Sequence, residues 1–264
     1  MNIGIVGLGV VGQAIEHGFK KLGHNVIVHD IKFDTKLCDL KACEIIYVCV
    51  PTPQSDSGEC DISIVKSVIS DLSSLKYCGY VCIKSTVEPG TTERMIKQFS
   101  DLNISFVPEF LRERCAEVDF VENHDVCIIG SADDGAYAAI KLSHGKFPEK
   151  FVRLTPTEAE YSKYFNNVYN ATLVTFANSF YELCKLSGVN YTNVKEAITA
   201  RRNISDVYLD CNDNLRGFGG MCLPKDTNAL AHLAEKLNTD VEFFQYILKE
   251  NKKYEVTVFR GMRK

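Results

Sequence analysis

The stretch NIGIVGLGVVGQAIEHGFKKLG, residues 2–23, decides the fold of this chain. Its first five residues have the pattern of a buried strand, and residues 10–23 have the period of an amphipathic helix. Between them, Gly7, Gly9 and Gly12 show the G-x-G-x-x-G spacing. Such glycines permit a tight turn, close approach of the backbone to a pyrophosphate, and close packing of the helix. We therefore predict a dinucleotide site at the N-terminus of this helix.

A carboxylate at the end of the second predicted strand supports this site. Asp30 follows Gly12 by 18 residues. A carboxylate there accepts hydrogen bonds from a ribose and repels a 2′-phosphate, which favours NAD over NADP. Lys32 is close enough to weaken that preference. The alternative is a glycine turn in an α/β fold that binds no nucleotide.

Short apolar runs alternate with helical patterns through the first half of the chain. We predict strands at 2–6, 25–30, 45–51, 80–86, 104–109 and 126–130, and helices at 10–23, 61–75 and 91–100. Apolar runs separated by helices predict a parallel sheet with helices on both faces.

After Phe151 the pattern becomes helical. One long helix is predicted, with Thr155 and Glu158 as a capping box, Pro156 in the first turn, and Gly188 at its end. It spans about 32 residues, or roughly 48 Å. Because it is apolar almost all round, both sides should be covered, either in a core or between domains or subunits.

Further elements complete the predicted architecture. We predict helices at 192–199, 226–238 and 240–253, and a strand within 254–264. The fold class is therefore α/β. An N-terminal Rossmann-type parallel-sheet domain, residues 1–152, precedes a mostly α-helical domain, residues 153–264, with one long central helix.

Composition excludes several classes of function. Of 264 residues, 45% are hydrophobic and 24% charged, and the net charge of −4 argues against binding nucleic acid or an anionic membrane through bulk charge. No run of about 18 apolar residues predicts a membrane span, and the N-terminus lacks a basic leader, so we expect a cytoplasmic protein. The 11 cysteines form no C-x-x-C pair and the six histidines are scattered, so no metal site is predicted.

Five motifs occur in a specific order along the chain. They are VCVPTP followed by Gly58 and Asp61 (48–61), KSTVEPGTT (84–92), PEFLRE (108–113), EAEYSKYFNN (158–167) and GFGGMCLPKD (217–226). Together they resemble the UDP-glucose/GDP-mannose dehydrogenase family over essentially the whole chain. The resemblance implies an enzyme that oxidises the C6 alcohol of a nucleotide sugar, UDP-glucose above all, to a carboxylate with two NAD.

The resemblance also implies roles for individual residues. Cys222 matches the family's nucleophile, Lys163 and Asn167 its oxyanion-stabilising pair, and Asp226 the carboxylate beside the cysteine. Glu113 and Thr86 match groups linked to water activation, and Glu109 lies in the same motif as Glu113. The predicted cofactor site comprises Gly7, Gly9, Val10, Val11, Gly12, Asp30, Pro51, Thr52, Thr86 and Glu113.

The chemistry of a double oxidation explains why a cysteine is needed. An aldehyde has no hydride to lose until a nucleophile adds to it. A thiolate traps it as a thiohemiacetal, whose hydride can leave to give a thioester. Cys222 precedes a helix expected to begin near Asp226, and a helix N-terminus stabilises a thiolate. The alternative is a cysteine packed in a glycine turn.

The remaining candidates also have ordinary structural explanations. Lys163 and Asn167 are four apart on one helix and can hold one anionic oxygen, but alone they would fit a solvated surface. Glu109 and Glu113 are also four apart, and Arg112 and Arg114 could simply neutralise them. Thr86 could be a turn hydroxyl before Pro89 and Gly90.

The chain departs from the family in two respects. Family members are usually longer, with a second nucleotide-binding-like domain after a strand such as the one predicted within 254–264. Ser179 stands where the family often has Glu. We expect a homodimer through the long helix, and a separate chain is a candidate source of the missing domain.

Two further interpretations stay open. A β-hydroxyacid-type dehydrogenase shares the Lys-x-x-x-Asn helix and needs no cysteine. The chain could instead be an inactive NAD-binding remnant or a subunit that partners another chain.

Overall fold

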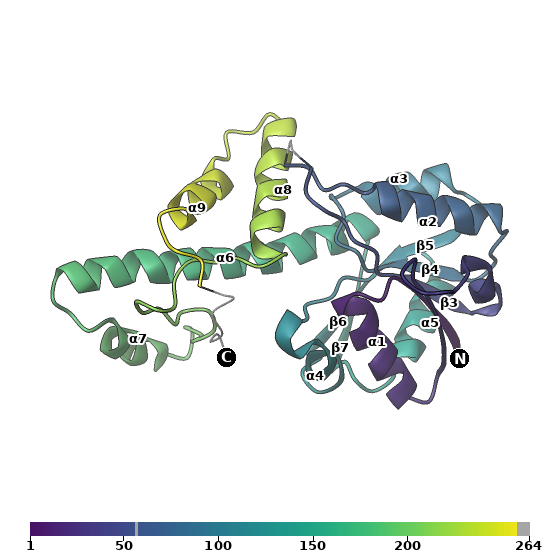
Figure 1. The fold of residues 1–264 in the computed structure, drawn as a ribbon, viewed down its shortest axis with the longest axis horizontal. Helices are drawn as coiled ribbons and strands as arrows, with labels where there is room; N and C mark the ends of the chain where they lie inside the picture. Colours follow the sequence, from purple (N-terminus) through teal and green to yellow (C-terminus); the bar gives the residue numbers. More distant parts are fainter. Residues whose placement is uncertain (56–57, 258–264) are drawn as a thin grey trace. The chain divides into compact units, whose positions relative to one another are not determined.

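The computed structural model describes residues 1–55 and 58–257, and these form two compact units (Figure 1). The first, here called the sheet unit, comprises Met1–Pro53 and Cys60–Lys163. The second, the helical unit, comprises Gln54–Glu59 and the chain from Tyr164 onward. Each unit is described by itself.

A seven-stranded sheet forms the centre of the sheet unit. Its order is β2-β1-β3-β4-β5-β6-β7. The strands are β1 (Asn2–Val6), β2 (Asn25–His29), β3 (Ile45–Val48), β4 (Tyr80–Ile83), β5 (Asn103–Phe106), β6 (Val126–Gly130) and β7 (Lys150–Leu154). The first six were predicted within three residues at each end, and the α/β class is confirmed.

The sheet is not parallel throughout. β1 to β5 pair in parallel, but β6 meets β5 antiparallel through the single pair Phe106 and Gly130. β7 then pairs in parallel with β6. The predicted direction of β6 was therefore wrong, and β7 was not predicted. Alternating charged and apolar residues at this edge, KFVRL, gave no buried-strand signal.

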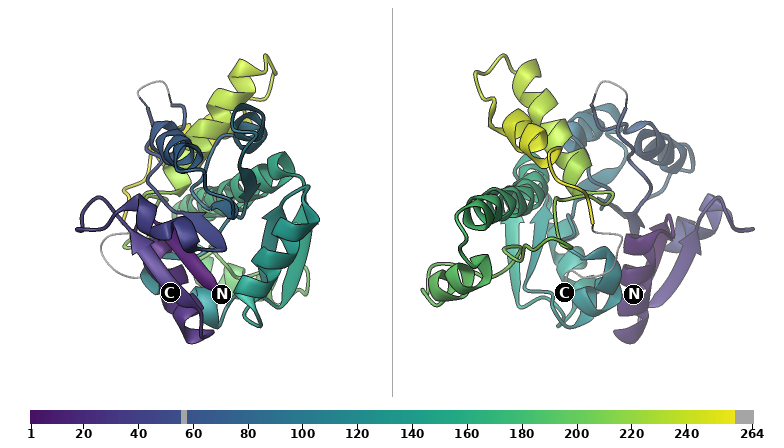
Figure 2. Two further views of the ribbon diagram at one scale, coloured as in Figure 1. Left: turned by 90° about the vertical axis from the view of Figure 1, so that its right-hand side faces the viewer. Right: turned by 60° about the vertical axis from the view of Figure 1, so that its left-hand side comes forward.

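Helices cover both faces of this sheet, as predicted (Figures 1 and 2). On one face α2 (Ser63–Ser74) and α3 (Thr91–Gln98) pack on apolar strand residues. On the other, α1 (Val10–Lys21), α4 (Ala116–Val121) and α5 (Asp134–His144) enclose a second apolar cluster. The helices α4 and α5 were not predicted from the sequence. Short 3₁₀ helices, η1 (Leu37–Ala42) and η2 (Glu113–Cys115), complete the unit.

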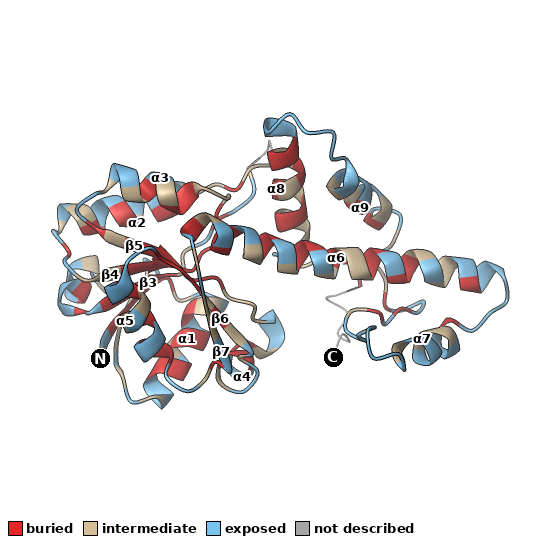
Figure 3. Ribbon diagram, turned by 180° about the vertical axis from the view of Figure 1, so that it is seen from behind, coloured by how far each residue is buried: buried red, intermediate tan, exposed pale blue. Residues whose placement is uncertain are grey.

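The long helix α6 (Pro156–Leu186) has 31 residues and passes from one unit to the other. Its predicted capping box is confirmed: the Thr155 amide donates to Glu158 over 2.8 Å, and the Glu158 amide donates to Thr155 Oγ1 over 3.3 Å. Gly188, at φ +67°, follows its end. One side of α6 is buried and the other exposed (Figure 3). The described residues therefore cover only one side of this helix, whereas cover on both sides was predicted.

Three more helices complete the helical unit: α7 (Tyr191–Thr199), α8 (Leu223–Lys236) and α9 (Phe243–Asn251). α8 begins three residues earlier than predicted, because Pro224 fits its first turn and Cys222 is its N-cap. The predicted strand within 254–264 is not found at 254–257, and residues 258–264 lie outside the described part. Across the described residues, no helix is both long and apolar enough to span a bilayer.

Candidate functional site

The glycine turn after β1 leaves open space where a phosphate would bind. Gly7 has φ +92°, and a Cβ there would lie 2.7 Å from the carbonyl oxygen of Cys49. A Cβ on Gly12 would overlap the carbonyl oxygen of Gly7. A Cβ on Gly9 would have nothing within 4 Å, and Gly9 is the N-cap of α1. Two glycines are therefore required by packing, and the third keeps the helix N-terminus open to an anion.

Asp30 is held beside this turn as an ionised carboxylate. One of its oxygens accepts from the Leu8 amide over 2.7 Å, and the other accepts from the Lys32 amide over 2.9 Å. These two backbone hydrogen bonds lower the pKa of Asp30 below its ordinary value. Its remaining lone pairs can accept from ribose hydroxyls, so the residues present fit the adenosine half of NAD.

Substitutions at Gly9 and Gly12 should separate cofactor binding from folding. Gly12→Ala is expected to lower the free energy of unfolding by about 1–3 kcal/mol, because the added methyl meets backbone. Gly9→Ala should cost less than about 1 kcal/mol, since its Cβ enters open space. It should nevertheless weaken NAD binding at least about tenfold by occupying the phosphate position. Urea unfolding and titration calorimetry measure the two effects, and unchanged NAD affinity in Gly9→Ala would contradict this site.

The loops after β3 and β4 lie beside β1 at the same edge of the sheet, because β1, β3 and β4 are neighbours and parallel. Thr52 is buried and Pro51 is exposed. The Ser85 hydroxyl donates to the carbonyl of Val50 over 2.7 Å and so joins the two loops. Thr86 is half-buried, and its carbonyl accepts from the Cys60 thiol over 3.2 Å. Both loops therefore lie at the edge of the sheet that carries the glycine turn, where parallel sheets bind ligands.

After β5, a buried ion pair joins Glu109 to α6. Lys163 Nζ donates to Glu109 Oε1 over 2.8 Å and to the Glu109 carbonyl over 2.6 Å. Burial acts to raise the pKa of Glu109, but the charge and hydrogen bond of Lys163, with the Leu111 amide, hold it below its ordinary value. Glu109 is therefore a fixed anion. Glu113, in contrast, is exposed at the first residue of η2.

In the helical unit, three candidate residues lie along adjacent turns of two helices. Asn167 Nδ2 donates to Asp226 Oδ2 over 2.6 Å, and both side chains are buried. The other oxygen of Asp226 lies 2.8 Å from Lys225 Nζ. Cys222, one turn earlier, is exposed, and its carbonyl accepts from the Asp226 amide over 2.9 Å. An exposed thiol at a helix N-terminus is where a thiolate is favoured.

Side-chain amides anchor the loop that leads to Cys222. Asn251 brackets Phe218: its Oδ1 accepts from the Phe218 amide over 2.7 Å, and its Nδ2 donates to the Phe218 carbonyl over 2.9 Å. Asn178 Oδ1 accepts from the Gly217 amide over 3.2 Å. The loop is therefore held by α9 at Phe218 and by α6 at Gly217, four and five residues before Cys222.

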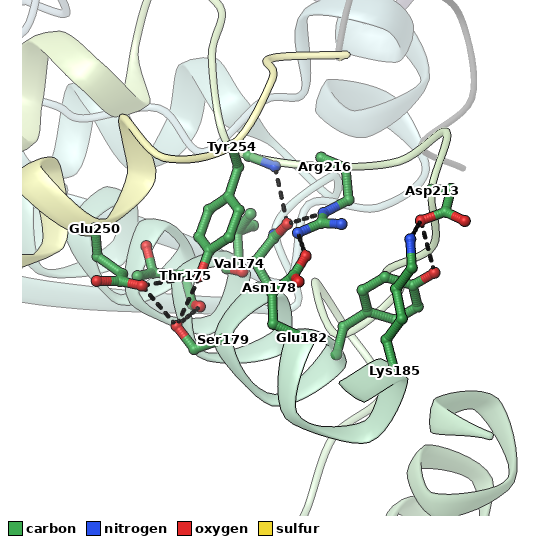
Figure 4. Close-up of polar contacts among 12 residues, drawn as sticks. Val174, Thr175, Asn178, Ser179, Glu182, Lys185, Asp213, Arg216, Glu250 and Tyr254 are labelled. Carbon is green, nitrogen blue, oxygen red and sulfur yellow. Dashed lines mark hydrogen bonds and ion pairs between the residues drawn. The ribbon is translucent and has the colours of Figure 1, made fainter. Parts of the chain in front are cut away.

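Arg216 adds a charged anchor to the same loop (Figure 4). Its guanidinium lies between the rings of Tyr181 and Tyr254, at 4.9 and 5.0 Å from their centroids. It donates to Asn178 over 2.8 Å and pairs with Glu182. Arg216, Glu182 and Tyr254 line a cavity of about 730 Å³ that does not include Cys222. Because its polar groups bond mainly to one another, we assign this cluster to holding the loop.

Lys225 and Arg216 were not among the residues predicted from the sequence. Lys225 lies in the first turn of α8, where a positive charge is unfavourable. A lysine at such a position indicates that a specific anionic group binds it, so the sequence could have predicted this residue. Arg216 gave no local signal, since its partners come from residues 34 to 38 positions away. Among the described residues, no group of three His, Cys, Asp or Glu side chains could hold a metal ion.

Comparison with known proteins adds independent information. Residues 31–146 match the model for the UDP-glucose/GDP-mannose dehydrogenase family, NAD binding domain, and residues 157–253 match the model for its central domain. The UDP-glucose 6-dehydrogenase TuaD of Bacillus subtilis is 28% identical over 300 residues, covering 97% of this chain and 64% of that protein. The UDP-glucose 6-dehydrogenase of Pseudomonas aeruginosa is 31% identical over 240 residues, covering 84% and 51%. The chain thus spans two thirds or less of these relatives.

Solved structures agree with this match. A UDP-glucose dehydrogenase from Pyrobaculum islandicum is 27% identical with a TM-score of 0.88, covering 96% of this chain and 68% of that one. The 3-hydroxyisobutyrate dehydrogenase of Mycobacterium tuberculosis, 14% identical, has a TM-score of 0.77 and covers 96% and 92%. The second likeness shows only that the fold is shared.

Proposed function

Because the chain belongs to the UDP-glucose/GDP-mannose dehydrogenase family, we propose that it is an NAD-dependent nucleotide-sugar 6-dehydrogenase. Its substrate is UDP-glucose or a related nucleotide sugar, which it oxidises to the uronic acid. One observation carries the proposal: an exposed Cys222 caps α8 one turn before a buried Asp226 that is bonded to Asn167. The reducing cytoplasm, where 11 cysteines stay as thiols, is the compartment that fits.

In this proposal the chain's own residues perform four tasks. Asp30 and the open Gly9 position bind the cofactor, which when bound accepts a hydride from each oxidation step. The Cys222 thiolate adds to the aldehyde carbon and forms a thiohemiacetal. Lys163 and Asn167 donate hydrogen bonds to the oxygen that carries negative charge. Glu113 and Thr86 orient the water that hydrolyses the thioester, releasing the acid and regenerating the thiol.

The test is an NADH assay on the untagged chain with UDP-glucose, GDP-mannose, UDP-N-acetylmannosamine and simple hydroxyacids. The proposal expects two NADH per molecule of one nucleotide sugar. Since the chain covers 64% of TuaD, the assay is repeated with a second chain that corresponds to the remaining part of such relatives. Activity only in that mixture would show that a separate partner is required. No NADH from any nucleotide sugar in either condition would refute the proposal.

The β-hydroxyacid alternative stays open because such enzymes share the Lys-x-x-x-Asn helix, here Lys163 and Asn167. It predicts that a simple hydroxyacid is oxidised once, without any need for Cys222. The same substrate panel distinguishes the two, because one NADH per hydroxyacid selects the alternative. NAD binding without turnover would instead select an inactive remnant or a partner subunit.

We also propose that the chain forms a homodimer through α6. Phe165 and Tyr169 are 75% and 52% exposed and stack with ring centroids 6.4 Å apart. Phe176 and Phe180 form a second exposed pair further along the same helix. Exposed aromatic residues in such number are typical of an interface. Sedimentation equilibrium should give twice the chain mass, and Phe165→Glu should give the monomer; a monomeric wild type would refute this assembly.

A further inference from the structure

Glu160, in the second turn of α6, is a buried acid whose hydrogen-bond partners lie far from it in the sequence. Its side chain is 0% exposed. Its two carboxylate oxygens accept from the Gly90 amide over 2.5 Å and from the Thr92 amide over 2.7 Å. These amides lie at the start of α3, so one side chain of α6 fixes a helix N-terminus about 70 residues earlier in the chain.

The segment that Glu160 fixes carries a candidate site residue. Residues 84–90 connect β4 to α3 and include Thr86. The near end of this loop is held by Ser85, which donates to Val50, and by Cys60, which donates to the Thr86 carbonyl. Glu160 holds its far end, at Gly90 and Thr92.

The same stretch of α6 also holds the next loop of the sheet. Lys163, three residues after Glu160, binds Glu109 after β5. Within one helical turn, a carboxyl group therefore fixes the loop after β4 and an ammonium group fixes the loop after β5. Parallel strands place both loops at one edge of the sheet, which is where such sheets bind ligands.

We propose that Glu160 is a positioning residue whose carboxylate fixes the 84–92 loop and thereby holds Thr86 in place for catalysis. The catalytic part of this inference rests on the proposed function. The part that concerns the loop does not, because it can be measured without substrate.

Packing alone does not explain a carboxylate at this position, since glutamine has nearly the same volume. Burial raises the pKa of Glu160 to about 7, against the opposing effects of the Thr92 and Gly90 amides and of Arg94, the charged group of α3 that acts on it. A folded pKa above the ordinary 4.5 means that stability falls as pH rises between those two values. Ionised Glu160 therefore fixes the loop although its charge opposes folding.

The decisive variant is Glu160→Gln, with Glu158→Gln as its control. Glu158 is an exposed cap two residues earlier on the same helix. At pH 8, Glu160→Gln should keep or raise the melting temperature, yet lower kcat/KM at least about tenfold. Amide hydrogen exchange in residues 84–90 should accelerate at least about tenfold. Glu158→Gln should show the opposite pattern: a lower melting temperature with unchanged exchange in the loop and unchanged kcat/KM.

A pH profile supplies a readout that a purely structural role would not change. The fall in kcat/KM of the wild type as pH drops below about 7 should be shallower in Glu160→Gln, in which the Cys222 thiolate must still be ionised but no carboxyl titrates at position 160. Unchanged exchange in residues 84–90 of that variant would overturn the inference, whether or not the wild type is active. Faster exchange with unchanged kcat/KM would overturn the catalytic part alone. A wild type that oxidises no nucleotide sugar would instead refute the proposed function.

Discussion

Cys222→Ser is expected to abolish production of the uronic acid, with a loss of at least about a thousandfold in kcat. Serine keeps nearly the same shape, but its hydroxyl is not ionised at neutral pH, so it adds poorly to an aldehyde. The side chain is exposed and lies at a helix start, where serine is a good cap, so stability should change by less than about 0.5 kcal/mol. NADH absorbance and mass spectrometry of the products measure both oxidation steps.

The matched control is Cys78→Ser, an exposed cysteine of the sheet unit outside the candidate site. It should retain full activity, which separates loss of the nucleophile from general thiol effects. A Cys222→Ser variant that still yields two NADH per sugar would contradict covalent catalysis. A fully active Cys222→Ala variant that oxidises a simple hydroxyacid would select the β-hydroxyacid alternative.

Lys163→Ala is expected to lower the free energy of unfolding by about 3–5 kcal/mol, the largest effect on stability that we predict. The side chains of the pair are only 4% and 11% exposed, and removing the lysine leaves the Glu109 carboxylate buried without its cation. The pKa of Glu109, now held low, should rise in the variant. Urea unfolding of the protein without cofactor at pH 7.5 (a condition that avoids any effect of ligand binding) measures the loss.

A double variant without either charge tests the pair itself. Glu109→Gln combined with Lys163→Met removes both charges, and it should recover most of the stability lost in Lys163→Ala. Activity should not recover, because the proposed oxyanion donor is gone. A loss of less than about 1 kcal/mol in the free energy of unfolding of Lys163→Ala would show that the ion pair is exposed to solvent. A solvated surface position is the ordinary explanation of Lys163 from the sequence alone.

Local patterns predicted most of the fold. The period of apolar residues located six strands, and the Thr155–Glu158 capping box located the start of α6. Elements with weak patterns were missed: β7 is a partly charged edge strand, and α5 has a glycine in its first turn. The direction of β6 depends on how the chain returns to the sheet, which no local period encodes.

The candidate site, like the fold, was predicted only in part from the sequence. Motif spacing predicted the glycine turn, Asp30 and the position of Cys222 before a helix. It did not predict which groups bond to one another. The joint role of Lys163 and Asn167 at an oxyanion stays a prediction, and the structure adds the unpredicted partners Glu109 for Lys163 and Asp226 for Asn167. Partners that are tens of residues distant follow from tertiary packing, and a single sequence carries no measure of it.

The continuity of α6 limits how this protein can be divided for experiments. The sheet unit ends at Lys163, inside a helix that runs on to Leu186. A recombinant fragment ending there would retain only about two turns of helix, and so short a helix has little stability of its own. Fraying would then release Glu109 from its cation. We therefore expect that the sheet unit does not fold independently when it is cut at Lys163. Chimeras and truncated variants should keep all of α6 through Gly188.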